Sequence, residues 1–117
     1  MRKLVKVFKA LSDPNRVRIL KMLELRPLCV CELTQALNLA TSTVSKHLSL
    51  LREADLILDK KDGKWVYYYL NDTVPHPYGE VILPALQTWL EKDANVQVDR
   101  AQVLATCREE ACKIYEK

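Results

Sequence analysis

The sequence has few glycines and no long apolar run. Only 2 of its 117 residues are glycine, and no glycine-rich loop of the kind that holds phosphate groups is present. No apolar stretch approaches the ~20 residues that cross a membrane. Near the first residue, Lys6 and Lys9 interrupt the apolar pattern, so this segment lacks the core of a signal peptide. These absences argue against a membrane partner, and we expect a cytoplasmic protein.

The composition is typical of an ordered, helix-rich globular protein. Hydrophobic residues make up 49% of the chain and charged residues 28%. We expect a single domain over residues 1–117, because this length is too short for two independent cores. The formal net charge of +3 permits an anionic partner without requiring one. In a cytoplasmic protein the 4 cysteines are expected to be thiols, which makes them ligands, sensors or buried side chains rather than disulfides.

Apolar residues recur at helical spacing through most of the chain. Ser12 or Asp13 can cap a helix whose first residue is Pro14, and Thr41 is the expected cap of a later helix. Pro84 must lie in the first turn of its helix or kink it. The predicted helices are residues 3–11, Pro14 to near Arg26, 31–38, a long helix from Thr41, roughly 80–92 and roughly 98–115.

The stretch "ILDKKDGKWVYYYL" predicts two strands joined at Asp62-Gly63, because Asp-Gly favours a tight hairpin turn. A short helix, a turn, a second helix with a polar outer face and then a hairpin make a winged helix-turn-helix. The predicted fold is therefore mainly α with a small β-hairpin wing. Its helix-turn-helix spans about 31–54, its wing about 56–70 and its C-terminal helices about 80–116.

The helix from Thr41 has one apolar and one polar face. If Val44, Leu48 and Leu51 point inward, the opposite face carries small hydroxyls and one lysine, which suit the major groove of DNA better than a protein core. His47 falls on the inward side, where packing or a phosphate contact is expected rather than metal binding. A solvated face would look the same on an isolated helix, but the turn before it and the basic wing after it favour double-stranded operator DNA. The predicted DNA-binding residues are Ser42, Thr43, Ser45, Lys46, Ser49, Lys61 and Lys64, with Lys60 also near the wing tip.

Two apolar stripes are available for a second subunit. One recognition helix supplies few contacts, so a winged helix of this size is expected to read two half-sites as a homodimer. The first helix carries Leu4, Val7, Phe8 and Leu11 on one side, and the helix near Trp89 carries a similar stripe. Either stripe can instead close the core of a single subunit, and the sequence leaves this open.

Several segments, in order, resemble the ArsR/SmtB family of bacterial metal- and metalloid-responsive repressors. They are "FKALSDPNRVRILKML", "LCVCELTQAL", "STVSKHLSLLREADLI" and "KDGKWVYYYL". The resemblance covers essentially the whole chain. It implies a homodimeric repressor, not an enzyme, that controls a resistance operon and leaves its operator when an inducer binds.

The segment "CVCEL" resembles the arsenic- and antimony-sensing branch of that family, whose pattern continues to a third cysteine three residues after the second. Thr34 stands at that position here, although a pyramidal As(III) or Sb(III) centre takes three thiolates. The zinc-type site of the family uses His and carboxylates near the dimer interface. The corresponding stretch, "EVILPALQTWLEKD", contains no His, so we discount zinc.

The chemistry of Cys29 and Cys31 favours soft ions, namely As(III), Sb(III), Cd(II) or Pb(II). In a helix, residues i and i+2 lie ~200° apart, so one ion held by both needs non-helical backbone at the helix start. Inducer binding would then shift the helix that precedes the recognition helix. A third thiolate must come from Cys107 or Cys112, of the same or the partner subunit, and the sequence does not decide between them.

Two other functions use the same thiols. A redox switch can pair Cys29 or Cys31 with a C-terminal thiol, whereas a disulfide between residues i and i+2 would be strained. A thiol enzyme is disfavoured, because only Glu32 lies beside the thiols as an acid or base and no C-x-x-C motif occurs.

Overall fold

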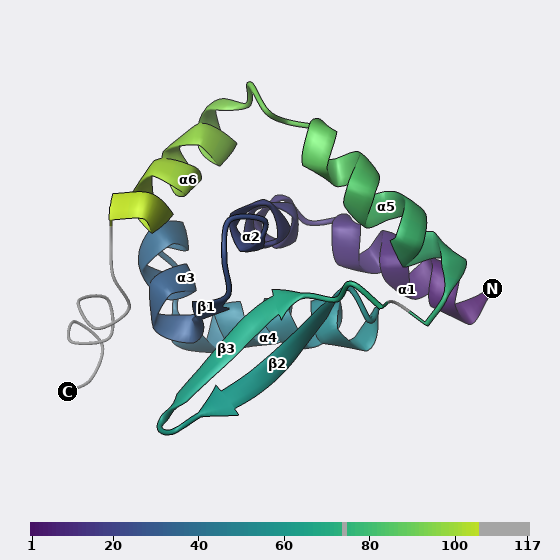
Figure 1. Cartoon of the computed structure of the whole chain (residues 1–117), viewed down its shortest axis with the longest axis horizontal. Helices are drawn as coiled ribbons and strands as arrows, with labels where there is room; N and C mark the ends of the chain where they lie inside the picture. Colours follow the sequence, from purple (N-terminus) through teal and green to yellow (C-terminus); the bar gives the residue numbers. More distant parts are fainter. Residues whose placement is uncertain (74, 106–117) are drawn as a thin grey trace.

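The computed structural model describes residues 1–73 and 75–105 (Figure 1). α2 lies at the centre, with α5 running beside α1 on one side and α6 beside α3 on the other (Figure 1). Within the described ranges, no helix is long and apolar enough to cross a membrane. The elements are α1 (Arg2–Leu11), α2 (Pro14–Leu23), β1 (Leu28–Cys29), α3 (Val30–Leu37), α4 (Thr41–Glu53), β2 (Ile57–Asp62), β3 (Trp65–Leu70), α5 (Pro77–Thr88) and α6 (Ala94–Ala105).

The winged helix-turn-helix is formed as predicted. Asp13 is the N-cap of α2 and accepts a hydrogen bond from the Asn15 N–H at 2.7 Å, while Pro14 is the first helical residue. The expected cap at Thr41 is wrong by one residue. Ala40 is the extended N-cap residue, and Thr41 already has helical geometry. The apolar stripe of α4 is fully inward, with Val44, Leu48 and Leu51 at 0%, 1% and 0% exposure.

The sheet has three strands in the order β1-β3-β2, one more than the predicted hairpin. β1 pairs antiparallel with β3 through Leu28 and Cys29, a segment of two residues that is too short to show a periodicity. The β2–β3 ladder runs to the pair Asp62↔Trp65. The turn is therefore Gly63-Lys64, one residue later than predicted. Gly63 has φ 61°, which glycine adopts without strain at the first central position of a hairpin turn.

α5 lies several residues earlier than the predicted 80–92. His76 is its N-cap and accepts a hydrogen bond from the Gly79 N–H at 3.3 Å, and Pro77 is the first helical residue. Pro84 therefore lies in the helix interior and not in the first turn. The helix stops at Thr88 because tertiary contacts of its last turn outweigh the apolar pattern that continues into Trp89, which is 53% exposed.

α6 begins at Ala94, four residues before the predicted start at 98. The side chain of Asp93 accepts hydrogen bonds from the N–H groups of Asn95 and Val96, at 2.9 and 3.1 Å, and so caps the first turn. The apolar spacing of the predicted helix 98–115 places Leu104, Cys107, Ala111 and Ile114 on one side, but Leu104 is 75% exposed while Val103 is buried. The remainder of that predicted stripe, Cys107, Ala111 and Ile114, lies outside the described residues.

Charged side chains join α2 to α6. Arg18 donates two hydrogen bonds to the Asp99 carboxylate, at 2.8 and 2.9 Å, and the Asp99 side chain is 3% exposed. This hydrogen bonding raises the pKa of Arg18 above its ordinary value. A bidentate contact of this kind fixes the relative position of the two helices as well as stabilising them.

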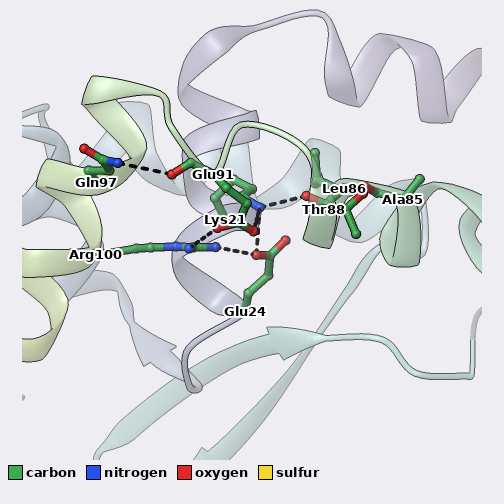
Figure 2. Close-up of polar contacts among 8 residues, drawn as sticks. All are labelled: Lys21, Glu24, Ala85, Leu86, Thr88, Glu91, Gln97 and Arg100. Carbon is green, nitrogen blue, oxygen red and sulfur yellow. Dashed lines mark hydrogen bonds and ion pairs between the residues drawn. The ribbon is translucent and has the colours of Figure 1, made fainter.

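A second cluster lies where α2 meets the α5–α6 connection (Figure 2). The Lys21 side chain is 1% exposed, and its Nζ donates to the Leu86 carbonyl at 2.7 Å and lies 2.9 Å from Glu24 Oε1 and 3.4 Å from Glu91 Oε1. Arg100 donates to the same two carboxylates, at 2.8 Å to Glu24 and 2.6 Å to Glu91. Each carboxylate thus has two cationic partners, which offsets the cost of burying Lys21.

Lys21 and Arg100 pair with the same two carboxylates, so the effects of replacing them on the free energy of unfolding should be strongly non-additive. Lys21→Met should change the free energy of unfolding by about 1 kcal/mol or less, because Arg100 still pairs with both carboxylates. Arg100→Met should change the free energy of unfolding by a similarly small amount, because Lys21 still pairs with both carboxylates. The double variant should lose about 3–5 kcal/mol, because the buried Glu24 then has neither cation. Urea denaturation of the four proteins measures this coupling, and additive losses would contradict it.

Glu91, the exposed carboxylate of this cluster, predicts that the free energy of unfolding depends on pH. The hydrogen bond from Arg100 lowers the pKa of Glu91 below its ordinary value of 4.5. A lowered pKa in the folded state adds stability above 4.5 that is lost as the pH falls through the folded-state value. Glu91→Gln should therefore lose less stability than the wild type on acidification. Thermal melting at stepwise lower pH tests this, and high salt should shrink the difference because the carboxylate is exposed.

Candidate functional site

The outer face of α4 carries the predicted polar residues. The side chains Ser42, Thr43, Ser45, Lys46 and Ser49 are all exposed. The position follows from packing, since burial of the Val44–Leu48–Leu51 stripe turns the other side of the helix to solvent. The face is small, hydroxyl-rich and cationic at one point, which matches the donors and acceptors of a DNA groove.

His47 lies between this face and the core, half-buried. Its Nδ1 is 3.1 Å from Arg16 Nη1. Arg16 is itself buried and donates to the carbonyls of Lys9 and Ala10, at 3.0 and 2.9 Å. The pair therefore joins α4 to the end of α1, so His47 has the packing role that its inward position predicts. The sequence pattern gave no sign of Arg16, which carries the contact.

The wing projects from the body with its lysines exposed. Lys60, Lys61 and Lys64 are all on the surface, and Lys64 Nζ lies 4.9 Å from the centre of the Trp65 ring. On the face toward α4, Arg52 binds Asp59 at 3.0 Å and so attaches the recognition helix to β2. Burial, followed by the charge of Asp59, raises the pKa of Tyr68.

The two thiols lie on either side of a change in backbone geometry. Cys29 is the last residue of β1 and the N-cap of α3, with φ −91° and ψ 167°, whereas Cys31 is the second helical residue. The predicted non-helical backbone is therefore present at Cys29. The Cys29 residue is 3% exposed and Cys31 is half-buried. Cys29 therefore lies at the N-cap of α3, and Cys31 lies in its first turn.

Glu32 and Arg26, neither of them assigned a structural role from the sequence, hold this turn. Glu32 Oε1 accepts a hydrogen bond from the Cys29 N–H at 3.1 Å, in a capping box with Cys29 in the place of the usual serine or threonine. Glu32 Oε2 lies 2.7 Å from Arg26 Nη2. The same nitrogen donates to the Val103 carbonyl of α6 at 3.1 Å. The sequence did contain one signal of this capping box, because Glu32 stands three residues after Cys29, a potential N-cap.

Thr34 does not complete a ligand set. It is 1% exposed, and its hydroxyl donates to the Val30 carbonyl at 2.6 Å. In the part of the chain that the structure describes, no three His, Cys, Asp or Glu side chains are placed to hold a metal ion. Cys107 and Cys112 lie outside the described residues. The described chain therefore contains two soft ligands, Cys29 and Cys31, of the three that As(III) takes.

An apolar groove runs between α1 and α5. It has a volume of about 290 Å³ and is lined by apolar and aromatic side chains, including those of Leu4, Phe8 and Tyr78. Phe8 is 60% exposed and Val81 69% exposed. The apolar stripe of the first helix, for which the sequence left both a core and an interface role open, is thus divided, because Val7 faces the core and Phe8 faces solvent. A contiguous surface of this kind is typical of a protein interface.

Several curated proteins are similar to this chain in sequence. The arsenic resistance transcriptional regulator ArsR1 of Pseudomonas putida is 42% identical over 92 residues, which cover 75% of this chain and 72% of that protein. The arsenical resistance operon repressor of Escherichia coli is 43% identical over 89 residues, covering 75% and 76%. A cadmium resistance regulatory protein, the CadC homolog of Staphylococcus aureus, is 47% identical over 68 residues, covering 57% and 56%. These relatives are transcriptional regulators and not enzymes, in agreement with the sequence-based prediction.

Solved structures share the fold. HlyU from Vibrio cholerae superposes with a TM-score of 0.61 at 33% identity, covering 73% of this chain and 88% of that one. A homodimeric winged helix-turn-helix domain from Mycobacterium bovis gives a TM-score of 0.64 at 20% identity, covering 80% and 82%. The sequence model of the bacterial regulatory proteins of the arsR family matches residues 13–58. This chain therefore belongs to the arsR family of bacterial regulatory proteins.

Proposed function

We propose that the protein is a homodimeric repressor that binds operator DNA through α4 and the wing and leaves it when As(III) or Sb(III) binds to thiolates. The observation that carries the proposal is the position of Cys29 and Cys31. They lie in the first turn of α3, which packs directly against the recognition helix α4. A structural change at the thiols therefore needs to pass only through α3 before it reaches α4 and its DNA-binding face.

The DNA-binding residues are Ser42, Thr43, Ser45, Lys46 and Ser49 of α4, with Lys61 and Lys64 of the wing. Their exposure and their chemistry support the assignment. The hydroxyls and Lys46 can reach base edges or phosphates, whereas the wing lysines neutralise the flanking backbone. Arg52 and Asp59 hold the wing against α4, so both elements approach the duplex as one unit.

The homodimer would form across the α1–α5 groove. Phe8 and Val81 expose apolar surface there, and a two-fold axis pairs such a patch with its own copy. Two copies of α4 would then reach two half-sites of one operator. Operator DNA and reduced thiols both place such a protein in the cytoplasm.

The third ligand is Cys107 in preference to Cys112. α6 packs against α3, and its last described residue is Ala105. Cys107 follows Ala105 by two residues in the sequence, whereas Cys112 follows it by seven. The shorter separation favours Cys107 as the third thiolate, from the same or the partner subunit.

Release would follow from a movement of α3. Three thiolates around one pyramidal ion have to approach each other, and Cys29 is held in an extended cap while Cys31 is held in a helix. Binding therefore pulls on the first turn of α3 and on its packing against α4. To move the dimer from nearly all DNA-competent to nearly all incompetent, the inducer must prefer the second state by ~10⁴-fold, about 5.5 kcal/mol.

This function predicts an inducer response that depends on specific cysteines. Operator DNA selected by the protein from a random library should be bound tightly and released on addition of As(III), as measured by fluorescence anisotropy. Cys29→Ser and Cys31→Ser should bind DNA as the wild type does but should not be released. Cys107→Ser should need a higher As(III) concentration, at least about tenfold, because one of three thiolates is lost. Cys112→Ser is the matched control and should respond normally.

The identity of the inducer is tested in parallel. A cadmium-responsive relative makes Cd(II) and Pb(II) the alternative inducers. If they release the DNA at lower concentrations than As(III) and Sb(III), the metalloid assignment is wrong. If oxidant alone releases the DNA and mass spectrometry finds an intramolecular disulfide, the thiols act as a redox switch. Release of the Cys29→Ser and Cys31→Ser proteins by As(III) would reject the thiol site itself.

The proposed interface predicts a monomer when a charge is introduced into it. Phe8→Glu should raise the dimer dissociation constant at least about a hundredfold, because an unpaired carboxylate in an apolar interface costs several kcal/mol. Sedimentation equilibrium measures this, and affinity for an operator with two half-sites should fall with it. Val98→Glu is the control, since Val98 is 68% exposed on α6 and does not line the groove. A dimeric Phe8→Glu protein would contradict the assignment.

A further inference from the structure

Arg26 is the one described side chain for which contacts join the loop before β1, the first turn of α3 and the last turn of α6. Its Nη2 lies 2.7 Å from Glu32 Oε2 and donates to the Val103 carbonyl at 3.1 Å. Its Nη1 faces the Pro27 carbonyl at 3.4 Å. A guanidinium presents several donors in a fixed plane, so one side chain can hold acceptors on two elements at once.

Glu32 needs this cation. Its side chain is 4% exposed, and a carboxylate removed from water is costly unless it is paired. Its other oxygen accepts the hydrogen bond from the Cys29 N–H. The chain of contacts is therefore continuous from the α6 carbonyl through Arg26 and Glu32 to the backbone of the first thiol residue.

The other end of this chain of contacts lies on α6, four residues before the proposed third ligand in the sequence. Val103 is two residues before Ala105, where α6 ends in the described structure, and Cys107 is four residues after Val103 in the sequence. The carbonyl of Val103 belongs to the last described turn of α6, and it accepts the hydrogen bond from Arg26 Nη2. Arg26 thus holds the chain end that leads to Cys107 against the turn that carries Cys29 and Cys31.

We propose that Arg26 is the positioning residue of the thiol site: through Glu32 and the Val103 carbonyl it fixes the distance between the Cys29–Cys31 turn and the end of α6. The inference rests on the proposed function, because it assigns to Arg26 the geometry in which thiolates from both segments meet one ion. A side chain that positions ligands in this way commonly changes metal affinity by about 10–100-fold when it is removed.

The test uses Arg26→Met, Glu32→Gln, their double variant and Arg26→Lys in the full chain. As(III) affinity is measured by titrating the thiolate-to-arsenic absorption. Arg26→Met and Glu32→Gln should each weaken As(III) binding by about 10–100-fold, and the double variant should be no weaker than Arg26→Met, because the two residues act as one unit. Arg26→Lys keeps the charge without the fork, so it should recover only part of the loss.

A second readout needs no arsenic. Amide hydrogen exchange of the apo protein should be faster at the Cys29 N–H in Arg26→Met, by about tenfold or more, because the acceptor Glu32 has lost its anchor. Arg18→Met is the matched control. It also removes an arginine contact to α6, through Asp99, but the hydrogen bonds of Arg18 in the described structure go to Asn15 and Asp99 and not to α3. Circular dichroism establishes that each variant is folded before it is scored.

The outcomes separate this inference from the function on which it rests. If As(III) does not release the wild type from DNA, the proposed function fails, whatever Arg26 does. If the wild type responds and Arg26→Met shows unchanged As(III) affinity and unchanged exchange at Cys29, the positioning role is wrong. If Arg18→Met weakens As(III) binding as much as Arg26→Met, the effect belongs to α6 docking in general, and this too rejects the special role of Arg26.

Discussion

The requirement that buried charges be paired organises the region around α2. This helix lies at the centre of the described structure (Figure 1). Three of its basic residues join it to the neighbouring helices. Arg16 binds the end of α1 and His47 of α4, Arg18 binds Asp99 of α6, and Lys21 binds the last turn of α5. Because an unpaired buried charge is costly, each contact fixes the geometry of the element that supplies the partner. These paired charges therefore fix one packing arrangement of the helices, which apolar contacts alone would leave free to shift.

This fixed frame gives α3 its importance. α2 is held by ion pairs to α6 and by hydrogen bonds to α1, whereas α3 is held at its first turn by Glu32 and Arg26. In the proposed function, a ligand that binds at this turn would act against a rigid surrounding, so the resulting strain would be directed to the contact between α3 and α4. An inducer only shifts an equilibrium by its differential affinity for the two states. A rigid frame with one adjustable turn lets most of that difference act on the DNA-binding face.

The sequence predicted the parts of the fold that depend on local patterns. The stripe Val44, Leu48 and Leu51, the cap at Asp13 and the two strands of the wing follow from local patterns, and the structure has them all. The errors arose where tertiary contacts decide. α5 ends at Thr88 because Lys21 takes the Leu86 carbonyl and the chain turns to bring Glu91 to Arg100, contacts between residues far apart in the sequence. β1 exists only because β3 pairs with it. The face of α6 was misjudged because Asp99, a charged residue, is buried there against Arg18.

The site shows the same division between local and long-range information. The exposed face of α4 and the extended backbone at Cys29 followed from spacing and from ligand geometry alone. Arg26 and Glu32 did not, because a basic residue before a proline and an acidic residue within a helix are common on any surface. Only the meeting of α3 with the end of α6 makes them partners. The contact between α3 and α6 is also relevant to the role of Thr34. The Thr34 hydroxyl is bonded to Val30 inside α3, so a third ligand of the proposed thiol site would come from another segment. Arg26 binds α6 at Val103, and α6 is the segment that continues in the sequence to Cys107.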